Sequence, residues 1–181
     1  MGKTKDKGGK MILEYCMTHP NVIPPTRANP SDAGLDIYFS PEDINEEIEL
    51  WHSRTCLLRT GLRFGVPHGY MLQVMNRSSV ASKKQLLVGA CVIDSGYDGE
   101  VFINLHNVGN NKQVIRRGDK IAQIVMVPVV PFRAYCRHDG ALYDYPITMS
   151  ERGDGALGST DRKPSLKDVL KTDNKSFNAM T

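Results

Sequence analysis

The chain has 181 residues, with 23 Lys and Arg against 20 Asp and Glu, and this length predicts one domain that buries its own core without disulfide support. No apolar run approaches the roughly 18 residues of a membrane span and residues 1–10 lack a secretory signal, so we expect a soluble, cytoplasmic protein. The basic excess lies at the two ends, which leaves a slightly acidic body and argues against a nucleic-acid-binding face on it.

In chain order, the sequence predicts a basic, disordered tail over residues 1–10, a folded body over 11–150, a glycine-rich arm over 151–160 and a basic extension over 161–181. Glycine and proline turn signals divide the body into many short apolar segments that are typical of strands. Such segments occupy residues 11–17, 54–60, 70–75, 100–107 and 120–130. Many short strands at this spacing predict an all-β sandwich or barrel. A short helix is predicted within residues 164–177 of the extension.

One short helix is predicted inside the body, at residues 78–84, where hydroxyl residues are followed by good helix formers. Arg77, Ser78 and Ser79 at its start combine a guanidinium, two hydroxyls and free backbone N–H groups, which suits a phosphate. Taken alone, this pattern also fits two serines that only cap the helix.

The segment from Gly89 to Asn107 holds one isolated carboxylate, Asp94, between apolar residues and a glycine-flanked Tyr97. A carboxylate at a strand end can take a proton from water and orient that water for attack. The structural alternative is an Asp that caps a turn and a half-buried Tyr.

Two later segments carry further polar candidates. Residues 118–123 form a turn entering a strand, so Asp119 is expected to fix the turn, whereas Gln123 could present its amide to a phosphate. Residues 152–160 are too rich in glycine for a core strand and fit an arm that closes over an anion, with Arg152 as the cation. A flexible linker would have the same composition.

The cysteines are scattered without a C-x-x-C pair and mostly adjoin apolar residues, which predicts free, buried thiols at Cys16, Cys56, Cys91 and Cys136. The five histidines are equally dispersed, and no two have metal-ligand spacing. We therefore predict no metal cluster built from protein side chains.

Five ordered segments resemble the motifs of the trimeric deoxyuridine triphosphate nucleotidohydrolases (dUTPases): AGLDIY at 33–38, NRSSVASK at 76–83, residues 89–107, GDKIAQ at 118–123 and RGDGALGST at 152–160. The resemblance spans residues 28–160. It implies an all-β, distorted β-barrel or jelly-roll fold with one short helix and a flexible C-terminal arm. It also implies a homotrimer with sites shared between subunits, and Mg²⁺-dependent hydrolysis of dUTP to dUMP and pyrophosphate, which limits uracil in DNA. Magnesium would be held mainly by the substrate phosphates and water.

The resemblance also assigns roles to matching residues. Asp94 would orient the attacking water, and Tyr97 would exclude the 2′-hydroxyl of a ribonucleotide. Asp36 would position its neighbours or metal-bound water at the phosphate end of the site, and a structural ion pair is an equal alternative for it. Arg152 would contact the γ-phosphate. The remaining substrate-binding positions are Arg77, Ser78, Ser79, Gly89, Ala90, Cys91, Val92, Ile93, Gln123, Leu157, Gly158, Ser159 and Thr160.

Three residues depart from the family pattern. Leu157 stands where a Phe usually stacks on uracil, and Ala156 replaces the preceding Gly. Cys91 replaces a Gly in the tight β-turn-β predicted from Gly89 to Ile93, whose backbone donors and acceptors would recognise uracil. Two other functions are alternatives to dUTP hydrolysis. A dCTP deaminase of the same fold is disfavoured because Asn104 stands where that enzyme needs a proton-shuttling Glu. A nucleotide-sensing or partner-binding module that uses the basic tails is the second alternative.

Overall fold

The structure is a computed structural model that describes residues 11–138; residues 1–10 and 139–181 lie outside the described range. Within that range it is built from strands and one short helix, so the all-β prediction is confirmed. The strands are β1 (Glu14–Met17), β2 (Leu35–Tyr38), β3 (Glu47–Leu50), β4 (Thr55–Arg59), β5 (Leu62–Gly65), β6 (Tyr70–Met75), β7 (Leu86–Val88), β8 (Val92–Ile93), β9 (Phe102–Asn107), β10 (Gln113–Arg116) and β11 (Lys120–Pro128). The helix is α1 (Ser78–Lys84).

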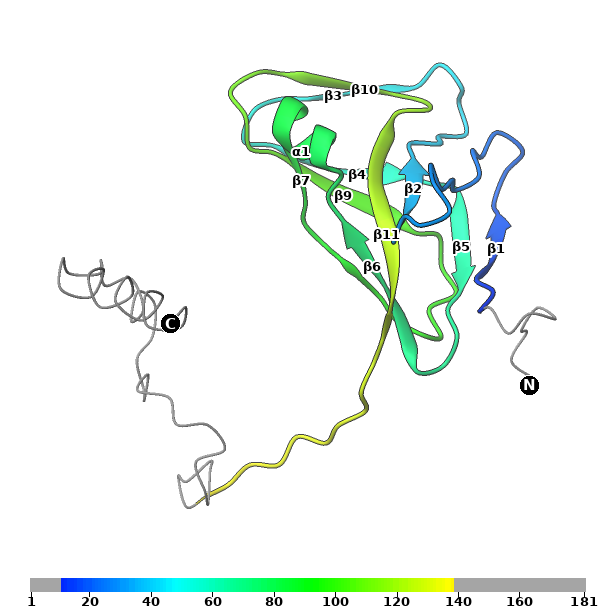
Figure 1. Cartoon of the computed structure of the whole chain (residues 1–181). Helices are drawn as coiled ribbons and strands as arrows, with labels where there is room; N and C mark the ends of the chain where they lie inside the picture. The colour runs from blue at the N-terminus through cyan, green and yellow to red at the C-terminus, as the bar shows by residue number, and fades with distance from the viewer. Residues whose placement is uncertain (1–10, 139–181) are drawn as a thin grey trace, which may run out of the picture. The chain divides into compact units, whose positions relative to one another are not determined.

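Two sheets form the centre of the body. One has the strand order β2-β11-β6-β8 and the other β4-β9-β7, and two further antiparallel pairs, β1-β5 and β10-β3, complete the described strands. Figure 1 shows β11 and β6 in one layer and β4, β9 and β7 in another, with the β3-β10 pair across the top and α1 beneath it. Every described strand pairing is antiparallel, as expected for short strands joined by turns.

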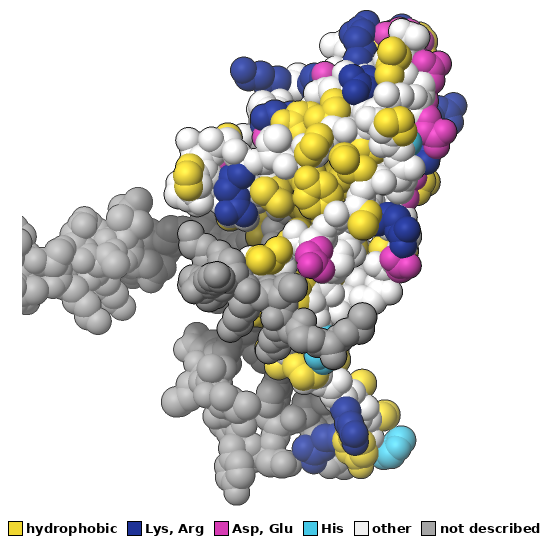
Figure 2. Space-filling model, turned by 90° about the vertical axis from the view of Figure 1, so that its right-hand side faces the viewer, with side chains coloured by type: hydrophobic (Ala, Val, Ile, Leu, Met, Phe, Trp, Pro, Cys, Tyr) yellow, Lys and Arg dark blue, Asp and Glu magenta, His cyan; other side chains and the backbone are white. Residues whose placement is uncertain are grey.

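The core lies between these two layers because alternate residues of each strand point inward. β6 and β9 show this alternation clearly: Leu72 and Val74 are buried on β6, and Ile103 and Leu105 are buried on β9. The outward residues of the second sheet include large apolar side chains, with Leu57 66% and Phe102 44% exposed. Figure 2 shows hydrophobic side chains gathered on one face of the molecule with basic and acidic side chains around them.

The five strand segments expected from the sequence correspond to β1, β4, β6, β9 and β11, and the helix covers its predicted residues 78–84. The prediction for the cysteines was half right. All four thiols are free, but Cys16, Cys91 and Cys136 are exposed, because apolar neighbours in sequence do not set which face of a strand or loop a side chain occupies. Cys56 is half-buried, and this burial raises the pKa of its thiol.

Residues 11–132 belong to one compact unit and residues 133–138 to a second. The expected limit of the body at residue 150, the arm over 151–160 and the helix within 164–177 all lie outside the described residues. Among the described residues, no helix is long and apolar enough to cross a membrane.

Candidate active site

The first part of the candidate site is a pocket of about 180 Å³ beside the start of α1. Its walls bring together four predicted positions that are far apart in the sequence, Asp36, Arg77, Ser78 and Gln123. They meet because β11 pairs with β2 on one side and with β6 on the other, so Gln123 lies opposite both Asp36 and Met75. Residues that the sequence did not point to, Ala28, Asp32 and Gly34, complete the lining.

Asp36 carries two basic side chains in this pocket. Its Oδ1 accepts a hydrogen bond from Arg77 Nε at 2.7 Å, and its Oδ2 accepts one from Lys120 Nζ at 2.8 Å. The hydrogen bond to Asp36 is the main reason that the pKa of Lys120 is raised. Because Arg77 uses Nε for Asp36, its two terminal NH₂ groups remain for an anion. These ion pairs hold Arg77 and Lys120 at the pocket, which fits a positioning role for Asp36 and a structural ion pair equally.

Lys120 reaches Asp36 because of a β-bulge in β11. The register with β2 shifts between Lys120 and Ala122, so that Lys120 lies opposite Tyr38 while Gln123 lies opposite Asp36. Side chains alternate along a strand, so without the extra residue Lys120 and Gln123 would point to opposite faces. The bulge puts both on the face of Asp36, and the sequence gives no local signal for it.

The serines at the start of α1 do not act as helix caps. Arg77 occupies the N-cap position and makes no capping hydrogen bond with its side chain. Neither the Ser78 nor the Ser79 hydroxyl has a hydrogen-bond partner among residues 11–138, and both residues are exposed. The structural alternative for these hydroxyls is therefore not supported, and Ser78 faces the pocket with its hydroxyl available.

Gln123 lines this pocket, and one of the two N–H donors of its amide is already used. Its Nε2 donates to the carbonyl of Asn76 at 2.9 Å, and a Cβ on Gly34 would come within 2.6 Å of its Oε1. Gln123 therefore ties β11 to the segment before α1, and a side chain at position 34 would push its amide out of place. Asp119 fixes its turn as predicted, since its carboxylate accepts from the Arg116 amide and from Lys84 Nζ, each at 3.2 Å.

The second part of the site is a separate pocket of about 230 Å³. It holds the predicted Asp94 and Tyr97, and it is completed by Val92, Ile93, Val101 and Phe102. Asp94 directly follows β8 and is exposed, and its carboxylate has no hydrogen-bond or ion-pair partner within the described part of the chain. A turn-capping Asp would use its side chain on the backbone, so the capping alternative is not supported here. The Asp94 carbonyl accepts from the Tyr97 amide at 3.2 Å.

The segment from Gly89 to Ile93 differs from the tight β-turn-β that the sequence predicts. The strands on its two sides do not pair with each other: β7 pairs with β9, and β8 pairs with β6. The segment crosses from one sheet to the other and is fixed at both ends, by Gly89 N–H to Asn104 O at 2.9 Å and Val74 N–H to Cys91 O at 2.8 Å. Ala90, between these ends, makes no backbone hydrogen bond among the residues described, so its N–H and C=O remain open to a ligand.

Asn104, which separates the two enzymatic alternatives, has a structural role. Its amide donates to Thr55 Oγ1 at 3.0 Å and to Cys56 O at 3.4 Å, and it lies against Gly89. An added Cβ on Gly89 would also meet the His106 ring, so the side chains of Asn104 and His106 would have to move if residue 89 were not a glycine. Asn104 links β9 to β4 and offers no carboxylate for deamination.

The two pockets share no lining residue and lie near opposite ends of β6. Ile93 is opposite Leu72, so Asp94 lies near the start of β6. Arg77 lies two residues after the end of the same strand. At about 3.3 Å per residue, Asp94 and the last residue of β6 are roughly 13 Å apart along the strand. One chain therefore presents the two parts of the predicted site well apart.

Three further observations show what lies outside the two pockets. A larger hollow of about 570 Å³, on the loop after β3, is lined by residues 51–54 and contains no predicted site residue and no carboxylate. Within residues 11–138, no group of three or more His, Cys, Asp and Glu side chains could hold a metal ion. The predicted arm residues Arg152, Leu157, Gly158, Ser159 and Thr160 lie outside the described residues.

Comparison with known proteins identifies the family of this chain. The family model described as dUTPase matches residues 21–160. The deoxyuridine 5'-triphosphate nucleotidohydrolase of Anaplasma marginale is 34% identical over 142 residues, which cover 75% of this chain and 87% of that protein. A variant dUTPase of Staphylococcus bacteriophage 80alpha, solved with dUpNHpp, has a TM-score of 0.66 at 26% identity and covers 82% of this chain and 97% of its own.

A variant dUTPase from phage phi11 of S. aureus, solved with a structural Mg(II) ion, has a TM-score of 0.63 at 25% identity and covers 70% of this chain and 97% of its own. The match over residues 21–160 and the identity to the Anaplasma marginale protein lead to one assignment. The chain belongs to the dUTPase family.

Proposed function

We propose that this protein hydrolyses dUTP to dUMP and pyrophosphate. The observation that carries the proposal is that one pocket holds the Asp94 carboxylate, which has no partner among the described residues, beside an exposed Tyr97, while the other holds the Arg77 guanidinium beside the Ser78 hydroxyl. The first group suits a water nucleophile next to a sugar, and the second suits a phosphate chain. Membership of the dUTPase family supplies the substrate class.

In the proposed reaction, Asp94 accepts a proton from a water molecule whose oxygen attacks the α-phosphorus. The new P–O bond forms as the bond from the α-phosphorus to the α–β bridging oxygen breaks, and pyrophosphate leaves. Ser78 donates a hydrogen bond at that bridging oxygen, and Arg77 offsets the charge on the phosphate oxygens. Tyr97 lies against the sugar and excludes a 2′-hydroxyl, while the open backbone of Ala90 hydrogen-bonds the uracil edge.

The described side chains fit a magnesium ion that is bound through the substrate. Mg²⁺ prefers oxygen ligands and keeps several waters, so triphosphate oxygens and water can complete its shell without a protein cluster. The Asp36 carboxylate, which is 13% exposed and lines the pocket beside α1, would accept hydrogen bonds from water bound to the ion. When bound, the ion would neutralise phosphate charge that Arg77 alone leaves uncompensated.

We also propose that each site is shared between subunits of a homotrimer. Water oriented by Asp94 and a hydroxyl at the α–β bridge must act on the same phosphorus, yet one chain holds their anchor points roughly 13 Å apart along β6. Asp94 and Tyr97 of one subunit would then face Arg77 and Ser78 of another. The exposed Leu57 on the outer side of β4 is available for subunit contacts.

The arm over residues 151–160 completes the proposed site. Arg152 would contact the γ-phosphate, helped by Ser159 and Thr160, and Leu157 would cover the base in place of an aromatic ring. Action on the free nucleotide pool would place the enzyme in the cytoplasm.

One assay tests the proposed reaction against its rivals. The protein is incubated with Mg²⁺ and each of dUTP, dTTP, dCTP and UTP, and pyrophosphate and ammonia are measured separately. We expect pyrophosphate from dUTP alone. Ammonia from dCTP would contradict the exclusion of deamination that rests on Asn104, and absence of pyrophosphate from every nucleotide would contradict the hydrolase assignment.

A further inference from the structure

The loop from Asp94 to Val101 carries both the proposed catalytic carboxylate and the sugar-binding ring, and its far end is fixed to β5. Val101 is buried, and its amide donates to the Leu62 carbonyl at 2.8 Å, while its carbonyl accepts from the Thr60 hydroxyl at 2.6 Å. Between Asp94 and Val101 the residues are exposed or half-buried. The position of Tyr97 therefore depends on contacts that the loop itself makes.

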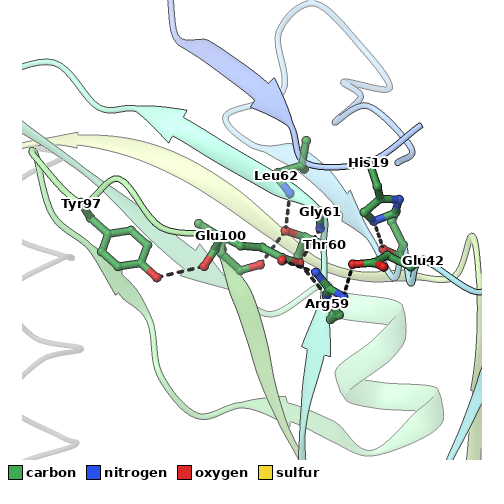
Figure 3. A network of polar contacts seen from close by, with 10 residues as sticks. His19, Glu42, Arg59, Thr60, Gly61, Leu62, Tyr97 and Glu100 are labelled. Carbon is green, nitrogen blue, oxygen red and sulfur yellow. Dashed lines mark hydrogen bonds and ion pairs between the residues drawn. The ribbon is translucent and has the colours of Figure 1, made fainter. Parts of the chain in front are cut away.

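Ser95 donates to the Val66 carbonyl and Asp98 pairs with Arg63, but the contact that reaches Tyr97 itself is made by Glu100. Its Oε1 accepts from Arg59 Nε at 3.2 Å and from the Gly61 amide at 3.0 Å, and its Oε2 accepts from Arg59 Nη2 at 2.7 Å. The Glu100 side chain is only 12% exposed. Its backbone carbonyl accepts the hydrogen bond from the Tyr97 hydroxyl at 2.9 Å. Figure 3 shows this network running from Tyr97 through Glu100 to Arg59 and the Thr60–Gly61 segment.

The ion pair between Arg59 and Glu100 has a more fixed geometry than an exposed surface ion pair. Arg59 meets Glu100 through two parallel N–H donors, which fixes the direction of the carboxylate as well as its distance. Burial alone would oppose ionisation of Glu100, but the hydrogen bonds from Arg59 and Gly61 outweigh it and lower the pKa of the carboxyl. Arg59 is itself held by Glu42 at 2.6 Å, so the anchor is built from three charged side chains.

We propose that Glu100, held by Arg59, is a positioning residue that sets the discrimination of this enzyme against ribonucleotides. The inference rests on the proposed function, because it takes Tyr97 as the group that excludes the 2′-hydroxyl. Tyr97 is 49% exposed, and the described hydrogen bond of its side chain is the one to Glu100 O, so a shift of Glu100 moves the hydroxyl and with it the ring.

The test replaces Glu100 by Gln, which keeps the shape but removes the charge and one of the two acceptor oxygens. The readout is the ratio of kcat/KM for dUTP to kcat/KM for UTP. We expect this ratio to fall about tenfold, as for a lost charge-assisted hydrogen bond, with a smaller fall for Arg59→Lys, which keeps the charge but not the two-pronged geometry. The matched control is Glu49→Gln, which breaks the Lys112 pair on the β3-β10 side and should leave the ratio unchanged.

The outcomes separate positioning from general stability. If Glu100→Gln lowers the melting temperature but keeps the wild-type ratio, Glu100 is structural and the proposal is overturned. If Glu100→Gln fails to fold, Arg59→Lys decides, and a wild-type ratio in that variant overturns it equally.

Failure of the proposed function would look different. Wild-type protein would then leave dUTP intact, but hydrogen exchange of residues 94–101 would still report the anchor. Faster exchange there in Glu100→Gln than in Glu49→Gln supports the anchoring role without any activity. Equal exchange in both variants removes it.

Discussion

Gly99 lies directly against the ring of Tyr97, and this contact gives a sharp prediction about substrate selection. A Cβ at position 99 would come within 2.6 Å of Tyr97 Cζ, whereas ordinary contacts lie at 3.4–4 Å. In Gly99→Ala the ring must therefore move by about 0.8 Å or more, a displacement close to the roughly 1 Å that can cost up to a hundredfold in rate. The backbone at Gly99 is not in the left-handed region, so the methyl acts through the ring and not through backbone strain.

We expect Gly99→Ala to change substrate selection much more than stability. Tyr97 is 49% exposed, so its ring can move outward at little cost, and we expect Gly99→Ala to change the free energy of unfolding by about 0.5 kcal/mol or less. The outward movement breaks the hydrogen bond to Glu100 O and opens space beside the sugar. We expect kcat/KM for dUTP to fall between about tenfold and a hundredfold, and kcat/KM for UTP to fall much less.

A double-mutant cycle tests whether the effect passes through the ring. Steady-state kinetics with dUTP and UTP are measured for Gly99→Ala, Tyr97→Ala and the double variant, with Gly65→Ala as control because its added Cβ meets only ordinary contacts at 3.7 Å. Gly99→Ala should have almost no effect once Tyr97 is Ala. An equal loss in both backgrounds would refute the reasoning, since the methyl would then act elsewhere.

Three further predictions concern the carboxylates of Asp94, Asp36 and Glu100. Asp94→Asn should lower kcat about a hundredfold while a non-hydrolysable dUTP analogue still binds by calorimetry; a matching loss of affinity would indicate a structural Asp. Asp36→Asn should lower the free energy of unfolding, measured in urea at fixed protein concentration, by about 1–2 kcal/mol. Glu47→Gln, which breaks an exposed ion pair with Arg116, should lower it by less than about 1 kcal/mol. Equal losses would show that the Asp36 ion pairs stabilise the fold no more than a surface ion pair does. Because the folded-state pKa of Glu100 is lowered, its contribution to stability is present above the ordinary carboxyl pKa of about 4.5 and is lost as the pH falls through its folded value. The urea midpoint of the wild type should thus fall more steeply in acid than that of Glu100→Gln. Identical acid profiles would show that Glu100 makes no pH-dependent contribution to stability.

Local sequence patterns predicted much of the fold because turn residues and apolar alternation act locally. They placed α1 at residues 78–84 and β6 at residues 70–75, and they predicted an all-β body. The gathering of Asp36 and Arg77 around one pocket followed from the family motifs and not from any local pattern.

What the sequence could not show depends on strand register and on which strands become neighbours. The bulge that turns Lys120 toward Asp36 is one example, and the crossing of residues 89–91 between two sheets is another. Glu100 carried no signal either, because its partner Arg59 lies 41 residues earlier on β4. Such pairings form only when the sheets are assembled, so spacing along the chain does not reveal them.

Subunit complementation tests the central claim most directly. Asp94→Ala and Arg77→Ala chains, each inactive alone, are mixed, unfolded and refolded together, and dUTP hydrolysis is measured. If each site takes Asp94 from one subunit and Arg77 from another, random mixing at equal amounts leaves about one site in four intact, and about a quarter of wild-type activity should return. If both residues act from the same chain, every site lacks one of them. The mixture would then stay as inactive as its parents, and a site built between subunits would be contradicted.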